Sequence, residues 1–269
     1  GMTKFHHDSA YYLEHLKNLK LPSNTLLEGA RCEASNSVAP IFIVGIPRCG
    51  STLLENIICS GPEPVLKGEE PSVMLQALNH TIKLEHEQFW LQFQTEVKAG
   101  YQKCQLLQDD LRFTDKSLEN VFLVEFILSL YPNAKIVYCK RNPLASAVSI
   151  LKNNMVSLPW AHDIDEILKY IDNSLSTMEK WLDKYPTQIH TAEYEKLVVN
   201  QEEESKKLMS FCGLSWDKSC LAFNESANIM SKTASHIQIR EQINQKSLDY
   251  YKNYTVFFDA YKQKYSWLS

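Results

Sequence analysis

The residues best placed to do chemistry lie in the segment 41–54, which reads IFIVGIPRCGSTLL. An apolar run ends at Gly45, and apolar residues at helical spacing follow Gly50. This is the layout of a phosphate-binding loop between a buried strand and a helix N-terminus, where backbone N–H groups and the helix dipole hold an anion. The nucleotide-triphosphatase pattern requires Gly-Lys-Ser/Thr, but Ser51 stands where the lysine belongs, and Arg48 is the cation of the loop. We therefore predict a phosphate-binding loop that lacks the standard equipment for hydrolysing ATP.

A second cationic element, Lys140-Arg141, follows the predicted strand Lys135–Cys139. Ligands of doubly wound sheets gather at the carboxyl ends of the strands, so Arg48 and Arg141 could point into one crevice. Ser149, in the helix predicted over about 143–153, could add a hydroxyl. The alternative is that Arg141 caps a neighbouring helix and Ser149 is an ordinary helix residue, and the pattern alone leaves the two interpretations equal.

Glu69-Glu70 and Lys116 are the remaining candidates for proton transfer and charge stabilisation. The glutamates follow Gly68 and could supply a general base, but carboxylates at the start of a helix also occur simply because they favour the helix dipole. Lys116 follows a short predicted strand, Leu111–Thr114, and could be a catalytic cation or a surface lysine. Spacing alone favours the purely structural interpretation of both.

The elements that must position these residues alternate between strand and helix. The predicted strands are the run that begins at Ile41, then 111–114, 135–139 and 188–190, and the predicted helices are 8–20, a helix directly after the loop, 72–79, 85–100, 120–130, 143–153, 163–184, 194–198 and 202–212. Such alternation predicts a mostly parallel sheet covered by helices on both faces. We expect a single domain over residues 1–269, in which 1–39 form a helical N-terminal extension.

Composition limits the class of protein. The chain has 269 residues, with 28 Lys and Arg against 32 Asp and Glu, so bulk electrostatics give no support to nucleic-acid binding. Its seven cysteines are scattered without a Cys-x-x-Cys pair, which argues against a disulfide framework or zinc site and favours a reducing compartment. No apolar segment approaches the length of a membrane span, so we expect a soluble, cytoplasmic protein.

The motifs, taken in order, resemble the sulfotransferase family. They are Pro47–Leu54, Gly68-Glu69-Glu70, Thr114-Asp115-Lys116, Tyr131–Ile136 and Arg141-Asn142-Pro143. The resemblance is strongest to the branch that contains tyrosylprotein sulfotransferases and the bacterial sulfotransferases often fused to tetratricopeptide repeats, although too few residues precede the loop for such repeats. It extends through Tyr194–Leu197 to Thr233-Ala234-Ser235, and so covers about residues 40 to 255.

The resemblance implies the sulfotransferase fold, a P-loop-like parallel sheet flanked by helices on both faces. It also implies 3′-phosphoadenylyl sulfate (PAPS) as donor, its bisphosphate PAP as product, and a hydroxyl-bearing small molecule or peptide as acceptor, with no metal. The resemblance also implies donor-binding roles in three parts of the chain. The 5′-phosphosulfate would be bound by the loop residues Arg48, Cys49, Gly50, Ser51 and Thr52, and the 3′-phosphate by Arg141 and Ser149. The nucleotide pocket would include Tyr194, and the C-terminal donor loop would include Arg240, in preference to Lys232 or Lys246.

The catalytic roles implied by the resemblance fall on Glu70 as general base and Lys116 as catalytic lysine, with Arg48 sharing the stabilisation of charge. Sulfuryl transfer is an in-line displacement that depends on alignment and on charge neutralisation. Glu70 would take the proton of the acceptor hydroxyl, while the two cations would stabilise charge on the sulfuryl group and on the leaving oxygen.

The sequence departs from the family pattern at several positions. Cys49 replaces a serine of the loop, Asn142 an aspartate and Asn153 an arginine, and Pro71-Ser72 replace the Thr-Arg of the tyrosylprotein enzymes. Two other functions therefore stay open: a kinase-like P-loop enzyme, against which the missing lysine argues, and a non-catalytic PAPS-binding protein, against which the intact Glu70 and Lys116 argue.

Two regions could complete the molecule around the site. The segment 154–163 and the helices between 72 and 100 are expected to border the acceptor, with Trp160 either a pocket wall or ordinary core. The aromatic C-terminus, which includes Tyr250, Tyr254 and Phe257, either packs on the sheet or forms the interface of a homodimer.

Overall fold

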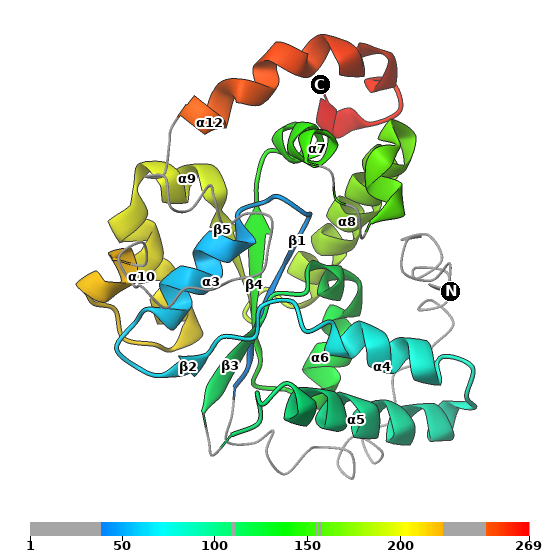
Figure 1. Ribbon diagram of the computed structural model, residues 1–269, viewed down its shortest axis with the longest axis vertical. Coiled ribbons are helices and arrows are strands. Elements are labelled where there is room, and N and C mark those ends of the chain that lie inside the picture. The colour runs from blue at the N-terminus through cyan, green and yellow to red at the C-terminus, as the bar shows by residue number, and fades with distance from the viewer. Residues whose placement is uncertain (1–38, 109–110, 154, 156–157, 223–245, 269) are drawn as a thin grey trace.

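A five-stranded parallel sheet, in the order β2-β3-β1-β4-β5, forms the centre of the computed structural model (Figure 1). The structure describes residues 39–108, 111–153, 155, 158–222 and 246–268, so the predicted helix 8–20 and N-terminal extension lie outside the described residues. The strands are β1 (Ile41–Gly45), β2 (Val65–Leu66), β3 (Arg112–Asp115), β4 (Lys135–Lys140) and β5 (Ile189–Glu193). The predicted α/β class with a parallel sheet is confirmed.

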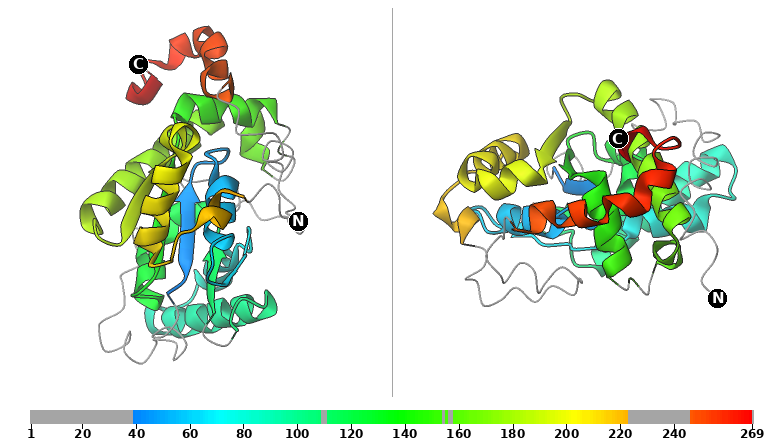
Figure 2. Two further views of the ribbon diagram at one scale, coloured as in Figure 1. Left: turned by 90° about the vertical axis from the view of Figure 1, so that its left-hand side faces the viewer. Right: turned by 90° about the horizontal axis from the view of Figure 1, so that it is seen from above.

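Helices connect and cover these strands. The α-helices are α3 (Ser51–Cys59), α4 (Val73–Thr81), α5 (His86–Lys103), α6 (Val124–Leu130), α7 (Pro143–Lys152), α8 (Ile164–Lys184), α9 (Tyr194–Val199), α10 (Gln201–Cys212) and α12 (Lys246–Asp249). The 3₁₀ segments are η3 (Leu118–Leu123), η4 (Pro159–His162), η5 (Lys218–Leu221), η6 (Tyr250–Tyr261) and η7 (Ser266–Leu268). The left view of Figure 2 shows α3 and the long helix α8 on opposite sides of the strands. No helix in the described part of the chain is both long and apolar enough to cross a membrane.

Strand β1 is the centre of the sheet and of the core. All five of its residues are buried, and it pairs with β3 on one side and with β4 on the other, from Ile41 opposite Lys135 to Gly45 opposite Cys139. A strand that is covered on both faces by helices needs apolar side chains in every position, which explains the continuous run rather than an alternating one.

The order of the strands sets where the site must lie. From β1 the chain crosses to β2 and β3 on one side of the sheet, and then returns past β1 to β4 and β5 on the other side. The loops that follow β1, β3 and β4 therefore leave the same edge of the sheet from adjacent strands. This reversal of direction is the point at which open α/β sheets bind their ligands.

Side-chain caps begin two of the helices, α7 and α8. Asn142 caps α7 by accepting a hydrogen bond from the Ala145 amide at 3.1 Å, and Pro143 occupies the first turn, as predicted. Asp163 caps α8 in the same way through the Glu166 amide at 3.0 Å. The apolar stripe of α8 is core, as its spacing predicts: Ile167, Leu168, Ile171 and Met178 are all buried.

Two predicted elements have different bounds in the structure, and one strand was missed. The single helix predicted over 120–130 is a 3₁₀ segment followed by α6, and β5 runs to Glu193 rather than ending at His190, because Thr191, Ala192 and Glu193 pair with β4 without an apolar pattern. Strand β2 was not predicted at all, since its two residues are too few to show a period.

The C-terminal segment packs on α7. Segment η6, orange to red in Figure 1, lies against α7 at the top of the molecule, and Phe258 is buried there. Val256 and Phe257 remain exposed. The aromatic C-terminus thus covers a helix rather than the sheet itself, and the homodimer stays a prediction.

Candidate active site

The loop between β1 and α3 turns sharply at Arg48 and Gly50, which both have left-handed backbone angles, φ 69° and 103°. Ser51 and Thr52 then open α3, where the first amides of a helix have no intrahelical acceptor and face outward from the N-terminus. The Arg48 side chain, nearly buried, donates from Nε to the Ser149 hydroxyl in α7 at 3.1 Å. The structure thereby joins the loop to the helix after β4.

Arg141, directly after β4, packs on the same loop. Its guanidinium donates to the Arg48 carbonyl oxygen at 2.6 Å and lies 4.6 Å from the centre of the Tyr194 ring. The same ring packs closely on Gly50, where a Cβ would lie only 2.3 Å from a ring carbon. Gly50 is therefore required twice, for its backbone angle and for the approach of Tyr194.

Two cationic side chains, Arg48 and Arg141, lie close together in this region. Burial and the neighbouring Arg141 both lower the pKa of Arg48. The Nε atom of Arg141 is buried and has no hydrogen-bond partner in the described part of the chain. A buried donor without a partner costs free energy, and two adjacent cations repel each other. An anion placed between the loop and Arg141 would relieve both costs.

Cys49 lies behind the loop and away from its surface. It is fully buried, and its carbonyl oxygen accepts from the thiol of Cys139, at the end of β4, at 3.2 Å. The interpretation of Cys49 as a small loop residue agrees with this position, since nothing outside can reach its sulfur.

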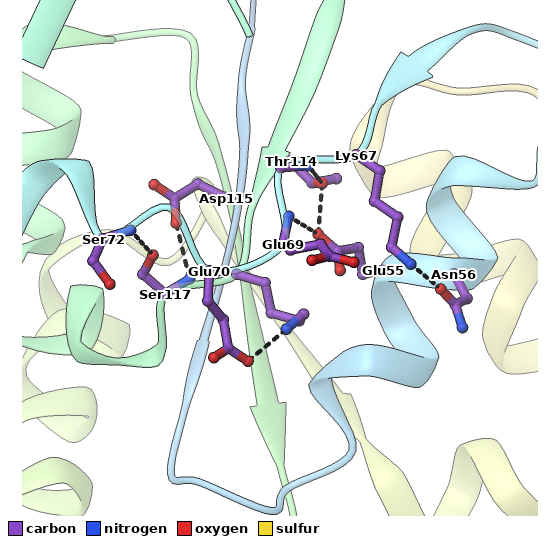
Figure 3. Close-up of polar contacts among 11 residues, drawn as sticks. Glu55, Asn56, Lys67, Glu69, Glu70, Ser72, Thr114, Asp115 and Ser117 are labelled. Atoms are coloured by element: carbon purple, nitrogen blue, oxygen red, sulfur yellow. Dashed lines mark hydrogen bonds and ion pairs between the residues drawn. The ribbon is translucent and has the colours of Figure 1, made fainter. Parts of the chain in front are cut away.

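Glu70 and Lys116 meet beside this loop, at the end of the neighbouring strand β3. Lys116 Nζ lies 2.8 Å from Glu70 Oε1 (Figure 3). The lysine side chain is 0% exposed and that of the glutamate 50% exposed, so the carboxylate faces outward while the ammonium holds it from within. The sequence left both residues open to a surface role, and the structure instead joins them in one ion pair.

The ion pair forms because the chain after β2 continues alongside β3. The parallel register of Val65 with Arg112 and Leu66 with Phe113 is prolonged by a bond from the Gly68 amide to the Thr114 hydroxyl at 3.1 Å and one from the Lys116 amide to the Glu69 carbonyl at 2.7 Å. A Cβ on Gly68 would lie 1.9 Å from the Thr114 carbonyl oxygen, so this approach requires glycine.

Glu55, from α3, is buried beneath the ion pair, and the sequence reasoning missed it. Its Oε1 accepts from the Thr114 hydroxyl at 2.8 Å and from the Glu69 amide at 2.9 Å (Figure 3). Burial raises the pKa of this carboxyl group. The available signal was a glutamate between the apolar residues Leu54 and Ile57, in the part of the helix that faces the core.

Asp115, likewise missed, anchors the far side of Lys116. It is fully buried and accepts from the Tyr101 hydroxyl at 2.7 Å and the Ser117 amide at 2.8 Å. The Ser117 hydroxyl in turn accepts from the Ser72 amide at 2.8 Å. The chain on both sides of Lys116 is thus fixed, Thr114 to Glu55 on one side and Ser117 to the start of α4 on the other.

The predicted site residues fall into two groups in the structure. Those predicted to bind the donor gather around the loop after β1: Arg48, Cys49, Gly50, Ser51, Thr52, Arg141, Ser149 and Tyr194. The second group is Glu70 with Lys116. Arg240 and Lys232 lie outside the described residues, as does the side chain of Lys246. Among the residues that the structure describes, no group of three or more His, Cys, Asp or Glu side chains is arranged to hold a metal ion.

Other candidates have structural surroundings. Asn142, which departs from the family pattern, donates from its side chain to the Tyr251 hydroxyl at 3.1 Å and from its backbone to Glu195 at 2.9 Å. Trp160 is buried and stacks on Tyr170 with ring centres 4.1 Å apart. Of the two interpretations given to Trp160, a pocket wall or ordinary core, this packing fits the second.

Comparison with known proteins assigns the family. The sequence model of the sulfotransferase family matches residues 40–218. The chain belongs to the sulfotransferase family. The match spans both groups of candidate residues up to Tyr194, as well as all five strands.

Individual relatives are distant. An uncharacterized protein of Aquifex aeolicus is 31% identical over 81% of this chain, and the protein-tyrosine sulfotransferase of Drosophila melanogaster is 24% identical over 70% of it. The matches cover 31% and 40% of those two proteins, so the chain spans only about a third of their length.

Solved sulfotransferases share the fold. The sulfotransferase domain from the curacin biosynthetic pathway aligns with a TM-score of 0.60 at 17% identity, over 80% of this chain and 90% of its own. Mouse sulfotransferase SULT7A1, solved in complex with PAP, aligns with a TM-score of 0.55 at 15% identity, over 90% of this chain and 89% of its own. At these identities the likeness concerns the fold alone.

Proposed function

We propose that the chain transfers a sulfuryl group from PAPS to a hydroxyl-bearing acceptor, a small molecule or a peptide. The observation that carries this proposal is the pair of unlike sites at one edge of the sheet. A cationic loop lies at the end of β1, beside Arg141, whose buried Nε has no partner among the described residues. A base held by a buried lysine lies at the end of the adjacent β3. Membership of the sulfotransferase family supports the same chemistry.

The loop residues fit the phosphate groups of this donor. The first amides of α3, with Ser51 and Thr52, would receive the 5′-phosphosulfate, and Arg48 would lie beside it. Arg141 and Ser149 would hold the 3′-phosphate, which would give the free Nε of Arg141 a partner. The Tyr194 ring would border the nucleotide. The donor supplies an activated sulfuryl group whose bond to the 5′-phosphate oxygen is broken in the reaction.

Glu70 and Lys116 have complementary tasks in this proposal. Glu70, half exposed, would accept the proton of the acceptor hydroxyl while the acceptor oxygen forms its bond to sulfur. Lys116 orients the carboxylate in the resting protein, and together with Arg48 it would stabilise the negative charge that develops on the sulfuryl and leaving oxygens. The leaving group departs as PAP, and the proton stays on Glu70 until solvent removes it.

The relatives named protein-tyrosine sulfotransferases make a tyrosine hydroxyl one natural acceptor to test. By the resemblance described above, Pro71-Ser72 of this chain replace the Thr-Arg of the tyrosylprotein branch, so a positive charge that could meet an acidic peptide is absent at that position. The acceptor class therefore stays at hydroxyl compounds, with phenols and tyrosine peptides as the first members of a screen.

Calorimetric titration tests the donor half of the proposal against its rivals. Adenosine 3′,5′-bisphosphate should bind at moderate salt, while ATP with magnesium should bind much more weakly because the loop lacks its lysine. A preference for magnesium-ATP would instead favour the kinase-like enzyme. Bisphosphate binding without sulfuryl transfer to any hydroxyl acceptor would favour a non-catalytic binding protein.

A further inference from the structure

Glu55 is a buried carboxyl group that joins two parts of the proposed site. It belongs to α3, one helical turn after Ser51 and Thr52, which begin that helix at the loop after β1. Its Oε1 atom holds the Glu69 amide at 2.9 Å and the Thr114 hydroxyl at 2.8 Å, in the two segments that carry Glu70 and Lys116 (Figure 3). One oxygen atom thus connects three segments that are distant in the sequence.

The surroundings of Glu55 show that its carboxyl group lowers the stability of the folded protein. The residue is 0% exposed, and its second carboxyl oxygen, Oε2, has no hydrogen-bond partner among the described residues. A buried polar atom without a partner lowers stability, and an apolar residue would fill this position of the core at less cost. The free energy spent here is explained if the two bonds of Oε1 serve the site.

The segment that Glu55 holds does not take its shape by itself. Glu69 adopts a left-handed backbone with φ 55°, a conformation that non-glycine residues adopt infrequently. Its amide is fixed by Glu55, and its carbonyl accepts from the Lys116 amide at 2.7 Å. Without the Glu55 acceptor, the Glu69 amide would lose its partner and the peptide would be free to rotate. Because Glu70 follows directly, its carboxylate would move with that peptide.

We propose that Glu55 is a positioning residue, which holds Glu70 and Lys116 in line with the loop after β1 by accepting from Glu69 and Thr114. This inference rests on the proposed function, since it assigns the same Glu70 as base. It adds that the helix which begins at the phosphate loop also sets the position of the base. The donor side and the acceptor side of the reaction therefore share one rigid support.

Two substitutions of similar size separate hydrogen bonding from packing. Glu55→Met keeps the length of the side chain but cannot accept from either donor. Glu55→Gln keeps a carbonyl oxygen at the Oε1 position and loses only the ionisable group. We expect Glu55→Met to lower kcat for transfer from PAPS to 4-methylphenol by about tenfold to a hundredfold, since small misplacements of catalytic groups have effects of that size. Bisphosphate affinity should stay within about threefold, and Glu55→Gln should restore most of kcat.

Amide hydrogen exchange gives a readout that does not depend on activity. The amides of Glu69 and Lys116 should exchange at least about tenfold faster in Glu55→Met than in the wild type, and remain protected in Glu55→Gln. Ile58→Val is the matched control, because Ile58 is a buried residue of the same helix without a role in these bonds. It should lower the melting temperature without a local change at Glu69.

The outcomes separate the two proposals. Equal loss of kcat in Glu55→Met and Glu55→Gln, or unchanged exchange at Glu69 in Glu55→Met, overturns the positioning role. The same holds if Ile58→Val reproduces the effect of Glu55→Met, since Glu55 would then act through stability alone. Failure of the wild type to bind adenosine 3′,5′-bisphosphate overturns the proposed function instead, and leaves the exchange result to decide whether Glu55 holds this segment.

Discussion

The loop after β1 and the segment at the end of β3 lie on adjacent strands, yet their electrostatics are opposite. Around the loop, the guanidinium of Arg141 donates to the Arg48 carbonyl oxygen, and the buried Nε of Arg141 has no partner among the residues described. At the end of β3, Lys116 is paired with Glu70, and the chain on both sides of the lysine is hydrogen bonded to neighbouring segments. The first region brings two cationic side chains close together, whereas in the second Lys116 is paired with a carboxylate of the protein.

This difference matches what each region is proposed to do. A site for a phosphate-bearing donor stores positive charge until the donor arrives, and the repulsion that this causes is released on binding. A base must keep one geometry whether or not a substrate is present, so Glu70 is already held by Lys116 in the resting protein. Both regions use a strained, left-handed residue, Arg48 in one and Glu69 in the other, with φ 69° and 55°.

The largest effect on kcat should come from breaking the ion pair between Glu70 and Lys116. Glu70→Gln removes the base while keeping its size, and Lys116→Ala removes the cation that holds it. Each should lower kcat about a hundredfold to ten-thousandfold, the usual range for a lost general base, while the dissociation constant for adenosine 3′,5′-bisphosphate changes little. Steady-state kinetics with PAPS and a phenol, together with calorimetry, measure both quantities.

Two consecutive charged residues of α8, Glu179 and Lys180, serve as controls for these two variants. Glu179 and Lys180 are exposed and distant in sequence from both regions, so Glu179→Gln and Lys180→Ala make the same chemical changes at the surface. They should leave kcat unchanged. Near-normal turnover in Glu70→Gln would show that this residue is not the base, whatever the effect at Lys116.

The next effect should come from the region around the loop after β1, and it should appear in the affinity for the donor rather than in kcat. Arg141→Ala removes the guanidinium that lies on Tyr194, and with it a charge-assisted contact to phosphate that is worth about 1.5–3 kcal/mol. We expect the dissociation constant for adenosine 3′,5′-bisphosphate to rise by about tenfold to a hundredfold, measured by calorimetry. The Arg141→Lys variant keeps the charge but loses the planar stacking, so its affinity should be intermediate.

A dissociation constant that does not change in Arg141→Ala would remove this residue from the donor site. The Arg48–Ser149 bond would then be the remaining link between the loop and α7 that supports a 3′-phosphate pocket.

The contrast also explains what could be predicted from the sequence. The loop after β1 was recognisable because its function depends on residues consecutive in the chain, from Ile41 to Leu54, and local spacing carries that information. The parallel sheet followed from the alternation of apolar runs with helical patterns. For the end of β3, spacing alone favoured surface roles for Glu70 and Lys116, and only the family resemblance joined them.

The supports of that second region were out of reach of the sequence for physical reasons. Strand β2 has two residues, and the pairing that continues past it uses the Thr114 hydroxyl and the Glu69 carbonyl rather than a regular ladder. Glu55 and Asp115 act across distances of 14 residues or more, through Glu69 and Tyr101. A buried carboxyl group looks like any other acidic residue until tertiary contacts enclose it.

The smallest effect concerns the dependence of stability on pH, and it tests whether the carboxyl group of Asp115, at the end of β3, is neutral. Burial raises the pKa of Asp115, against the opposing effect of the hydrogen bonds from Ser117, Tyr101 and Asn120. A carboxyl group with a raised pKa in the folded state binds its proton more tightly when folded. Its contribution to stability is therefore complete below the unfolded pKa of about 3.9 and is lost as the pH rises through the folded pKa. Asp115→Asn removes this titration, so the stability of the wild type relative to the variant should fall as the pH rises above about 4.

Urea unfolding at constant ionic strength, repeated across that pH range, measures the difference in the free energy of unfolding between the two proteins. Glu55, whose pKa burial also raises, is present in both proteins and cancels in the comparison. The pKa of Glu119 is raised by burial and also by the charges of Glu70 and Asp115, so the comparison includes the coupling of Asp115 to Glu119, which changes stability with pH in the same direction. A difference that grows with pH would mean that Asp115 is an ionised acceptor, favoured by its three hydrogen-bond donors over the cost of burial. In that case the end of β3 would balance Lys116 with two anions rather than with Glu70 alone, and the contrast with the loop after β1 would be one of net charge as well as of pairing.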